Sequence, residues 1–130
     1  KYTGILKPWN LEIFRKRLAD NGMLNQTDLF FLASGKLSAI CYRDEIEMAV
    51  RTPGFGGFQL LDLQDYPGQG TALVGMLDAF MDSKGLITPA AFRQFCNDVV
   101  VLAIMKKFCW TNNENLTAEI RIANFWSLCP

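Results

Sequence analysis

Hydrophobic residues recur at helical spacing in the first part of the chain. After Pro8, three large apolar residues fall on one stripe: Leu11, Phe14 and Leu18. This i, i+3, i+7 spacing is typical of an amphipathic helix. Pro8 suits the first turn of a helix, where its missing N–H is not needed. The pair Asn21–Gly22 is a common helix ending. The pattern therefore predicts a first helix between these two signals.

A second, longer helical pattern follows Asn25, which is a good N-cap residue. Apolar residues continue near helical spacing: Leu29, Leu32, Ala33, Leu37, Ile40, Cys41, Ile46, Ala49 and Val50. Gly35 weakens the pattern locally and indicates close packing. Residues 42–45 either continue the helix or kink it. Pro53 and Gly54 end it, because a residue before proline disfavours the helical backbone.

The periodicity changes between Gly57 and Gln64, where a mostly apolar run replaces the helical spacing. A run of this length is typical of a strand that is buried on both faces, as in parallel sheets covered by helices. Few other strand patterns lie nearby. Residues 71–82 are apolar with a loose helical period, and they predict either a short helix or an irregular packed loop. Thr88–Pro89 then predicts the start of a short helix.

The C-terminal part has strand character. Val99–Met105 is apolar and rich in β-branched residues, and Leu116–Phe125 alternates between apolar and polar residues. The polar segment Thr111–Asn115 lies between the two. These segments predict a hairpin-like antiparallel pair that begins a β module. The expected fold class is therefore α+β: mostly helical, with one buried strand followed by this C-terminal pair.

Composition narrows the possible functions. The chain has 130 residues, 50% of them hydrophobic, which is enough for one packed domain. Thirteen basic and thirteen acidic residues cancel, so no electrostatic footprint for nucleic acid is present. No apolar run approaches the roughly 20 residues of a membrane span. We therefore expect neither nucleic acid nor a membrane as a partner. The N-terminus has no signal-peptide pattern, and the localisation of the parent protein stays open between the periplasm and secretion.

The chain contains no histidine, which excludes Ser-His-Asp triads, Cys-His pairs and His-ligated metal sites within it. The four cysteines are widely spaced and form no CxxC motif: Cys41, Cys96, Cys109 and Cys129. Their even number permits disulfides. Cys41 and Cys96 fall in helical patterns, where cysteine often serves as a small core residue. We expect free thiols, no metal site and no cofactor.

One stretch combines acidic and amide side chains with a Gly/Pro loop. Asp62 and Asp65 lie near the end of the predicted strand, with Gln64 and Gln69 beside them. Paired carboxylates are used for acid–base work on glycosides and for binding hard cations. Residues three apart on a strand point to opposite faces, however, so both acids line one pocket only if the strand ends between them. The structural alternative is that Asp65 caps the next turn and Asp62 pairs with a basic group. A weaker alternative is a calcium or magnesium site at the two acids.

Three segments carry a resemblance to a known family: KYTGILKPWNLEIFRKRL, ASGKLSAICYRDEIEMAVRTPGFGGFQLLDLQDYPGQGTALVGMLDAF and SKGLITPAAFRQFC. Together they resemble part of a large bacterial glycoside hydrolase related to the β-galactosidases and β-glucuronidases of glycoside hydrolase family 2. The similarity runs from about Lys1 to Asn124 and is most specific at Gly54–Gly75. In that family GGFQLLDLQD is similar to the last strand of the (β/α)₈ barrel. Asp62 and Asp65 match the two family aspartates, whereas Leu61 and Leu63 stand where the family has tryptophans.

The resemblance implies that residues 1–98 are the C-terminal part of a barrel and that residues 99–130 begin a β-sandwich-like module. A complete barrel needs about 250 residues, so this chain would be a fragment. The family's catalytic glutamates lie on earlier barrel strands, which implies that the chain has no catalytic residue and is inactive alone. Its expected partner is a carbohydrate, contacted in the full protein through Asp65, Gln64, Gln69 and Asp62. The alternative is a non-catalytic module that binds carbohydrate or self-associates through exposed strand edges.

Overall fold

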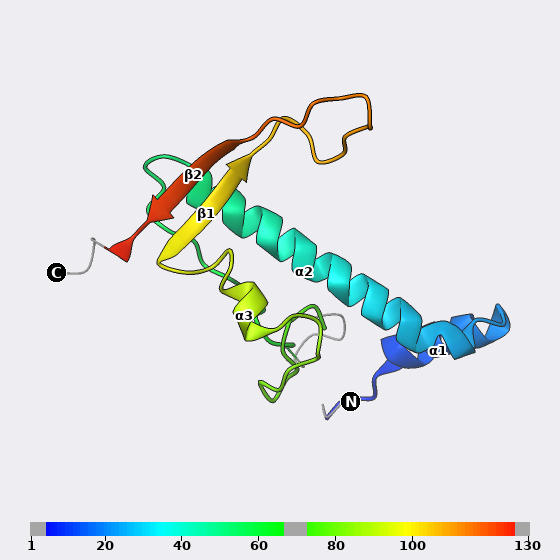
Figure 1. Ribbon diagram of the computed structural model, residues 1–130. Helices are drawn as coiled ribbons and strands as arrows, with labels where there is room; N and C mark the ends of the chain where they lie inside the picture. Colours follow the sequence, from blue (N-terminus) through cyan, green and yellow to red (C-terminus); the bar gives the residue numbers. More distant parts are fainter. Residues whose placement is uncertain (1–4, 67–72, 127–130) are drawn as a thin grey trace. The chain divides into compact units, whose positions relative to one another are not determined.

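The computed structural model describes residues 5–66 and 73–126, which combine helices with a small antiparallel sheet (Figure 1). In chain order the elements are α1 (Trp9–Asp20), the 3₁₀ helix η1 (Leu24–Gln26), α2 (Thr27–Arg51), α3 (Pro89–Phe92), β1 (Val99–Ile104) and β2 (Glu119–Asn124). This confirms the α+β class at the coarse level. The chain forms two compact units: the first comprises Lys1–Cys41 and Gln59–Thr88, and the second comprises Tyr42–Phe58 and Pro89–Pro130.

The two N-terminal helices follow the predicted pattern closely. Pro8 precedes α1, and Asn21 ends it with a backbone bond to the carbonyl of Arg17 (3.2 Å). Gly22 then adopts a φ of 67°, a conformation that favours glycine. The second helix starts at Thr27, because Asn25 belongs to η1 and does not cap α2 as predicted. The α2 helix continues without a break through residues 42–45, which settles the alternative that the sequence left open.

The predicted buried strand at Gly57–Gln64 is wrong. Residues 57–60 are irregular, Leu61 and Asp62 form a turn, and Leu61 is 82% exposed. Asp62 has a left-handed φ of 60°, which no strand residue adopts. A buried strand also needs neighbours for its backbone groups. Among the described residues, the strand pairing of this stretch is limited to an isolated bridge between Gln64 and Leu77.

The predicted C-terminal pair of strands is confirmed, with shorter bounds than the sequence suggested. β1 and β2 run antiparallel, with Val101 opposite Ile122 and Leu102 opposite Arg121. Val100 and Leu102 are buried, so one face of the sheet contributes to the core. In the connecting loop Glu114 accepts hydrogen bonds from Lys107 and from the Thr111 backbone (2.9 Å), and these bonds lower the pKa of its carboxyl. The loop is thereby held by ionic and polar contacts.

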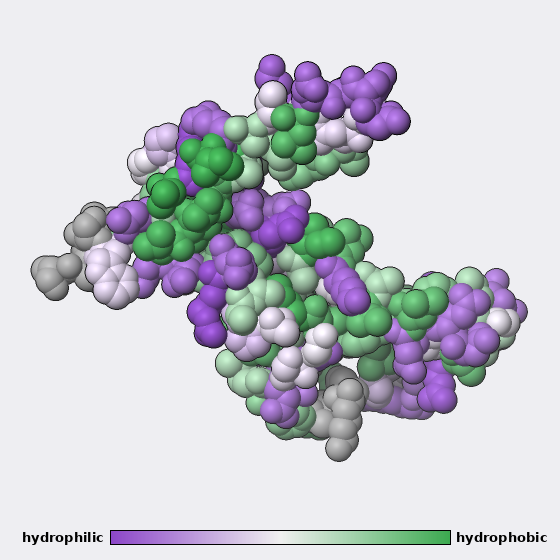
Figure 2. Space-filling view, viewed as in Figure 1, coloured by the Kyte–Doolittle hydropathy of each residue, from purple (hydrophilic) through white to green (hydrophobic). Residues whose placement is uncertain are grey.

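The other face of this sheet is apolar and open to solvent. On β1 it carries the residues that alternate with the buried ones, and on β2 the apolar residues opposite Ala103 and Val101: Val99, Val101, Ala103, Ile120 and Ile122. Ile120 is 63% exposed and Ile122 is 68% exposed. Figure 2 shows hydrophobic surface over the region of β1 and β2. We call these five residues the exposed sheet face.

Each unit has a small set of buried side chains. In the first unit, Ala39 and Met76 are buried, and so is the carboxylate residue Asp65. In the same unit, residues 73–82 are irregular, which agrees with the predicted packed loop and not with the predicted short helix. Close packing at Gly35 is also confirmed, since an added Cβ there would lie 2.3 Å from Leu86 Cδ2.

In the second unit the buried hydrophobic residues lie in α2, just after α3 and in β1: Ile46, Phe95, Val100 and Leu102. The Phe92 and Phe95 rings lie 4.9 Å apart at the predicted short helix, α3. No helix in the part of the chain that the structure describes has both the length and the apolar character needed to cross a membrane. The predicted division of the chain at residue 98 concerns two domains of a larger protein and stays a prediction.

Candidate functional site

Asp65 is the centre of the acidic stretch that the sequence singled out. Only 7% of the residue is exposed, which is unusual for an aspartate. Its Oδ1 accepts a hydrogen bond from Lys84 Nζ at 2.6 Å and one from the Gly75 backbone N–H at 3.0 Å. Lys84 is nearly as buried, with 11% of its side chain exposed. Asp65 and Lys84 therefore form a buried ion pair. The structural alternative expected Asp65 to cap the next turn and Asp62 to pair with a basic group, whereas here Asp65 has the basic partner.

Backbone bonds fix the position of this carboxylate. The Asp65 N–H donates to the Leu77 carbonyl at 3.0 Å, and the Leu77 N–H donates to the Leu63 carbonyl at 3.1 Å. Lys84 also donates to the Leu73 carbonyl at 3.2 Å. Three segments around residues 65, 75 and 84 are thus joined at one charged group. A buried carboxylate needs such partners, because an unpaired charge in the interior is very costly.

The other predicted site residues lie in different surroundings. Gln64 is exposed beside Asp65, so its amide is open to a ligand. Asp62 is partly buried in the turn at residues 61–62 and engages in an interaction of its own. Gln69 lies outside the described residues. The structure therefore places Gln64 next to a fixed carboxylate and gives Asp62 a separate role in the turn.

Among the described residues no three Cys, Asp or Glu side chains gather in a way that would hold a metal ion. The sequence also offered Asp65 as a ligand of calcium or magnesium. Lys84 already supplies a positive charge to Asp65 Oδ1, which argues against a metal cation at that atom. What this arrangement offers chemically is a fixed, charge-balanced carboxylate with an exposed amide beside it. Such a pair is suited to hydrogen bonding and does not by itself supply a nucleophile or a proton donor.

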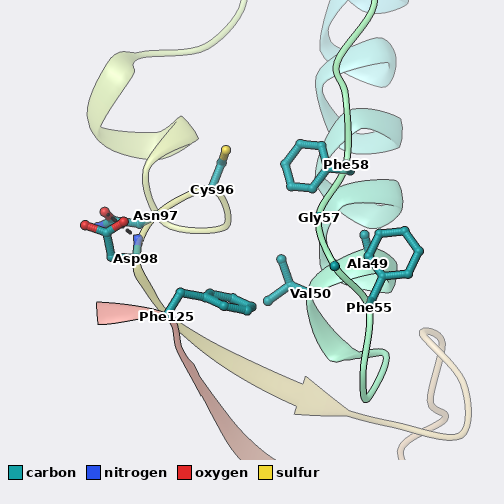
Figure 3. A pocket seen from close by; sticks show the side chains of 10 residues that line it. Ala49, Val50, Phe55, Gly57, Phe58, Cys96, Asn97, Asp98 and Phe125 are labelled. Carbon is teal, nitrogen blue, oxygen red and sulfur yellow. Dashed lines mark hydrogen bonds between the residues drawn. The ribbon is translucent and has the colours of Figure 1, made fainter. Parts of the chain in front are cut away.

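A hollow in the second unit was missed from the sequence. It has a volume of about 620 Å³ and lies between the end of α2, residues 55–58, residues 96–98 and the end of β2. Figure 3 shows Phe58 facing Cys96 at one side, with Val50 and Phe125 pointing toward one another at the other. The only sequence signal for it was the Phe-Gly-Gly-Phe run at residues 55–58. Gly57 and Phe58 of that run were assigned to the strand that does not form.

The three described cysteines, Cys41, Cys96 and Cys109, are free thiols, as predicted, and Cys129 lies outside the described residues. Cys41 and Cys109 are exposed, whereas Cys96 is partly buried at the hollow. Burial raises the pKa of the Cys96 thiol, because desolvation disfavours the thiolate.

We expect iodoacetamide at pH 8 to alkylate Cys96 more slowly than Cys41 and Cys109, because the thiolate is the nucleophile and less of it is present at Cys96. Quantitative peptide mass spectrometry would give the three rates. Raising the pH should reduce the difference, and unfolding in guanidinium should remove it. Faster alkylation of Cys96 than of the two exposed cysteines in the folded chain would contradict this expectation.

Comparisons with known proteins give no family assignment. No protein-family model matches the sequence, and no curated protein matches it either.

Proposed function

We propose that this chain is a segment of a glycoside hydrolase that cleaves glycosidic bonds as a whole enzyme, and that the segment is inactive alone. The observation that carries the proposal is the resemblance at Gly54–Gly75, where Asp62 and Asp65 stand at the positions of two family aspartates. In this proposal residues 1–98 derive from a (β/α)₈ barrel and residues 99–130 begin a β-sandwich-like module. No glutamate of the chain matches the family's catalytic positions, which supports the absence of activity.

The proposal also accounts for the failure of residues 57–64 to form a strand. The last strand of a barrel pairs with a neighbour on each side, and these pairs supply its backbone hydrogen bonds. Outside such a barrel the same residues find Leu77 as a bridge partner and otherwise follow an irregular path.

In this proposal the two central side chains have different tasks. Asp65, which is paired with Lys84, orients the loop, and the exposed Gln64 amide would contact a sugar hydroxyl. In this proposal Gln69 and Asp62 stay secondary sugar contacts. Aromatic stacking on the sugar is not expected at Leu61 or Leu63, because neither side chain has a ring.

We expect the purified chain to release no nitrophenol from nitrophenyl β-galactoside, β-glucoside or β-glucuronide, but to bind one of the corresponding methyl glycosides in calorimetry. Gln64→Ala should weaken that binding roughly tenfold, the effect of one lost hydrogen bond. Gln94→Ala is the matched control, because Gln94 is an exposed glutamine of the second unit. Turnover by this chain would refute the claim of inactivity. Absence of binding to all three glycosides would refute a sugar contact by the isolated chain.

A second candidate function is self-association, and the exposed sheet face favours it. Among the described residues each strand of the sheet has one neighbour, so each also has an edge with unpaired backbone groups. Such edges pair readily with another chain. Burial of Val101 and Ile122 between two copies would add a hydrophobic contribution of about 25 cal/mol per Å² of apolar surface.

We expect sedimentation of the chain to show dimers or larger species whose fraction grows with concentration, and Ile122→Lys to shift the distribution toward monomer. Phe108→Lys is the control, because Phe108 is 74% exposed in the same unit but lies outside the exposed sheet face. A wild-type chain that stays monomeric at high concentration would exclude self-association. Equal effects of the two substitutions would exclude the sheet face as its site.

A further inference from the structure

We propose that the hollow of the second unit is a binding site for a neutral, apolar small molecule that contains fused aromatic rings. The proposal is independent of any sugar site, since all the residues that line the hollow belong to the second unit, whereas Gln64 and Asp65 belong to the first.

The size of the hollow fits such a ligand. Its volume of about 620 Å³ lies within the range of roughly 300–1,000 Å³ that is usual for small-molecule sites. Three phenyl rings line it, from Phe55, Phe58 and Phe125. Aromatic rings in such walls favour flat apolar ligands, because ring pairs stack or meet edge to face.

All three rings have apolar surface that no protein atom covers. Phe55 is 48% exposed, Phe58 is 45% exposed and Phe125 is 38% exposed, although all three line the hollow. Figure 3 shows Phe58 and Cys96 on one side and Val50 with Phe125 on the other. A flat apolar molecule between these pairs would remove ring surface from water, which is favourable in proportion to the area covered.

The polar groups of the hollow argue against an anionic ligand. Asn97 Oδ1 already accepts a hydrogen bond from the Asp98 backbone N–H at 2.9 Å. In Figure 3 the Asn97 and Asp98 side chains extend away from the rings. Asp98, which also lines the hollow, adds a negative charge that repels a carboxylate or sulfonate. Because the Cys96 thiol stays neutral near pH 7, the remaining wall offers no charge to attract an ion.

Glycines leave one wall open. A Cβ added at Gly56 or Gly57 would meet nothing within 4 Å. Gly57 has a φ of 138°, a conformation that side chains rarely adopt, whereas Gly56 has no such restriction. A side chain at Gly56 can therefore narrow the hollow without the strain of a positive φ. A substitution there tests the volume of the hollow and leaves its three phenyl rings in place.

The site can be tested with Nile red, a neutral dye with fused aromatic rings whose emission shifts to the blue in apolar surroundings. We expect saturable binding of one dye per chain, with amide chemical-shift changes at Gly56, Gly57 and Asp98. Phe58→Ala should weaken binding roughly tenfold, and Gly56→Leu should weaken it similarly by filling space. Phe108→Ala is the control, because Phe108 is 74% exposed in the same unit, does not line the hollow and lies outside the exposed sheet face.

Several outcomes would overturn the proposal. Binding of several dyes per chain, or equal losses with Phe108→Ala and Phe58→Ala, would mean that the dye covers exposed apolar surface in general. If the affinity for the dye changes with the dimer fraction measured by sedimentation, the natural occupant of the hollow would be a second copy of the chain. Tighter binding of an anionic analogue, 1-anilinonaphthalene-8-sulfonate, would refute the requirement for a neutral ligand. If Phe58→Ala does not fold, as judged by circular dichroism, the Gly56→Leu result decides.

Discussion

Replacing Lys84 by methionine is expected to destabilise the first unit by about 3–5 kcal/mol, because it leaves the Asp65 carboxylate buried without its counter-charge. Asp65 and Lys84 meet at 2.6 Å with only 9% and 11% of their side chains exposed, so little solvent screens the remaining charge. A loss of this size is a large part of the stability of a small domain. Hydrogen exchange at the Asp65, Gly75 and Leu77 amides would measure it, because these amides lie in the same loop.

The chain offers a matched control for this ion pair. Lys16 and Asp20 also meet at 2.6 Å, but 75% and 56% of their side chains are exposed. Lys16→Met should therefore cost less than about 1 kcal/mol, as is usual for exposed pairs. The double substitution Asp65→Asn with Lys84→Met should cost less than Lys84→Met alone, because it leaves no buried charge. Equal costs for Lys84→Met and Lys16→Met would show that burial of the first pair is unimportant.

This prediction bears on how the sugar-binding proposal is tested. Substituting Asp65 would disturb the loop whether or not the residue contacts a ligand, since the same carboxylate joins Gly75 and Lys84. Gln64 is exposed, and its side chain can be shortened without removing a buried contact. A loss of binding in Gln64→Ala with unchanged hydrogen exchange would therefore separate ligand recognition from loop stability.

The helices and the C-terminal strand pair were accessible from the sequence because their signals are local. The stripe of Leu11, Phe14 and Leu18 and the alternation around Ile120 reflect regular backbone repeats of a few residues. The stretch at residues 57–64 has a strand-like composition, but a strand also requires partners, and no local pattern reports their absence. Asp62 with its φ of 60° shows that a turn prevailed over the apolar run.

The sequence singled out Asp65 and Gln64, but the lysine partner of Asp65 and the hollow could not be predicted, because both depend on residues distant in sequence. Lys84 follows Asp65 by 19 positions, and an isolated lysine in a turn-rich segment carries no signal for a buried partner. The hollow combines the end of α2 with residues around Cys96 and Phe125. Each segment has an ordinary composition by itself, and only their arrangement in the folded unit creates the space.

Replacing Gly75 by alanine is the second substitution with a large expected effect, about 2–3 kcal/mol of destabilisation in the same loop. An added Cβ would lie 2.4 Å from the Gln64 carbonyl carbon and 2.6 Å from the Asp65 nitrogen. Both are backbone atoms, so the clash cannot be relieved by a side-chain rotation. The backbone would have to move at residues 64 and 65, which carry the bond from Asp65 to Leu77 and the bond from Gly75 to the Asp65 carboxylate.

Comparison with two other glycines separates this effect from the general cost of a new methyl group. At Gly35 the added Cβ would meet the Leu86 side chain at 2.3 Å, which can rotate, and alanine favours the surrounding helix. At Gly56 it would meet nothing within 4 Å. Thermal unfolding and hydrogen exchange should therefore rank the costs as Gly75→Ala, then Gly35→Ala, then Gly56→Ala. If Gly75→Ala costs no more stability than Gly56→Ala, the segments around residues 65 and 75 do not pack as closely as this contact requires. The buried position of Asp65 would then no longer be supported.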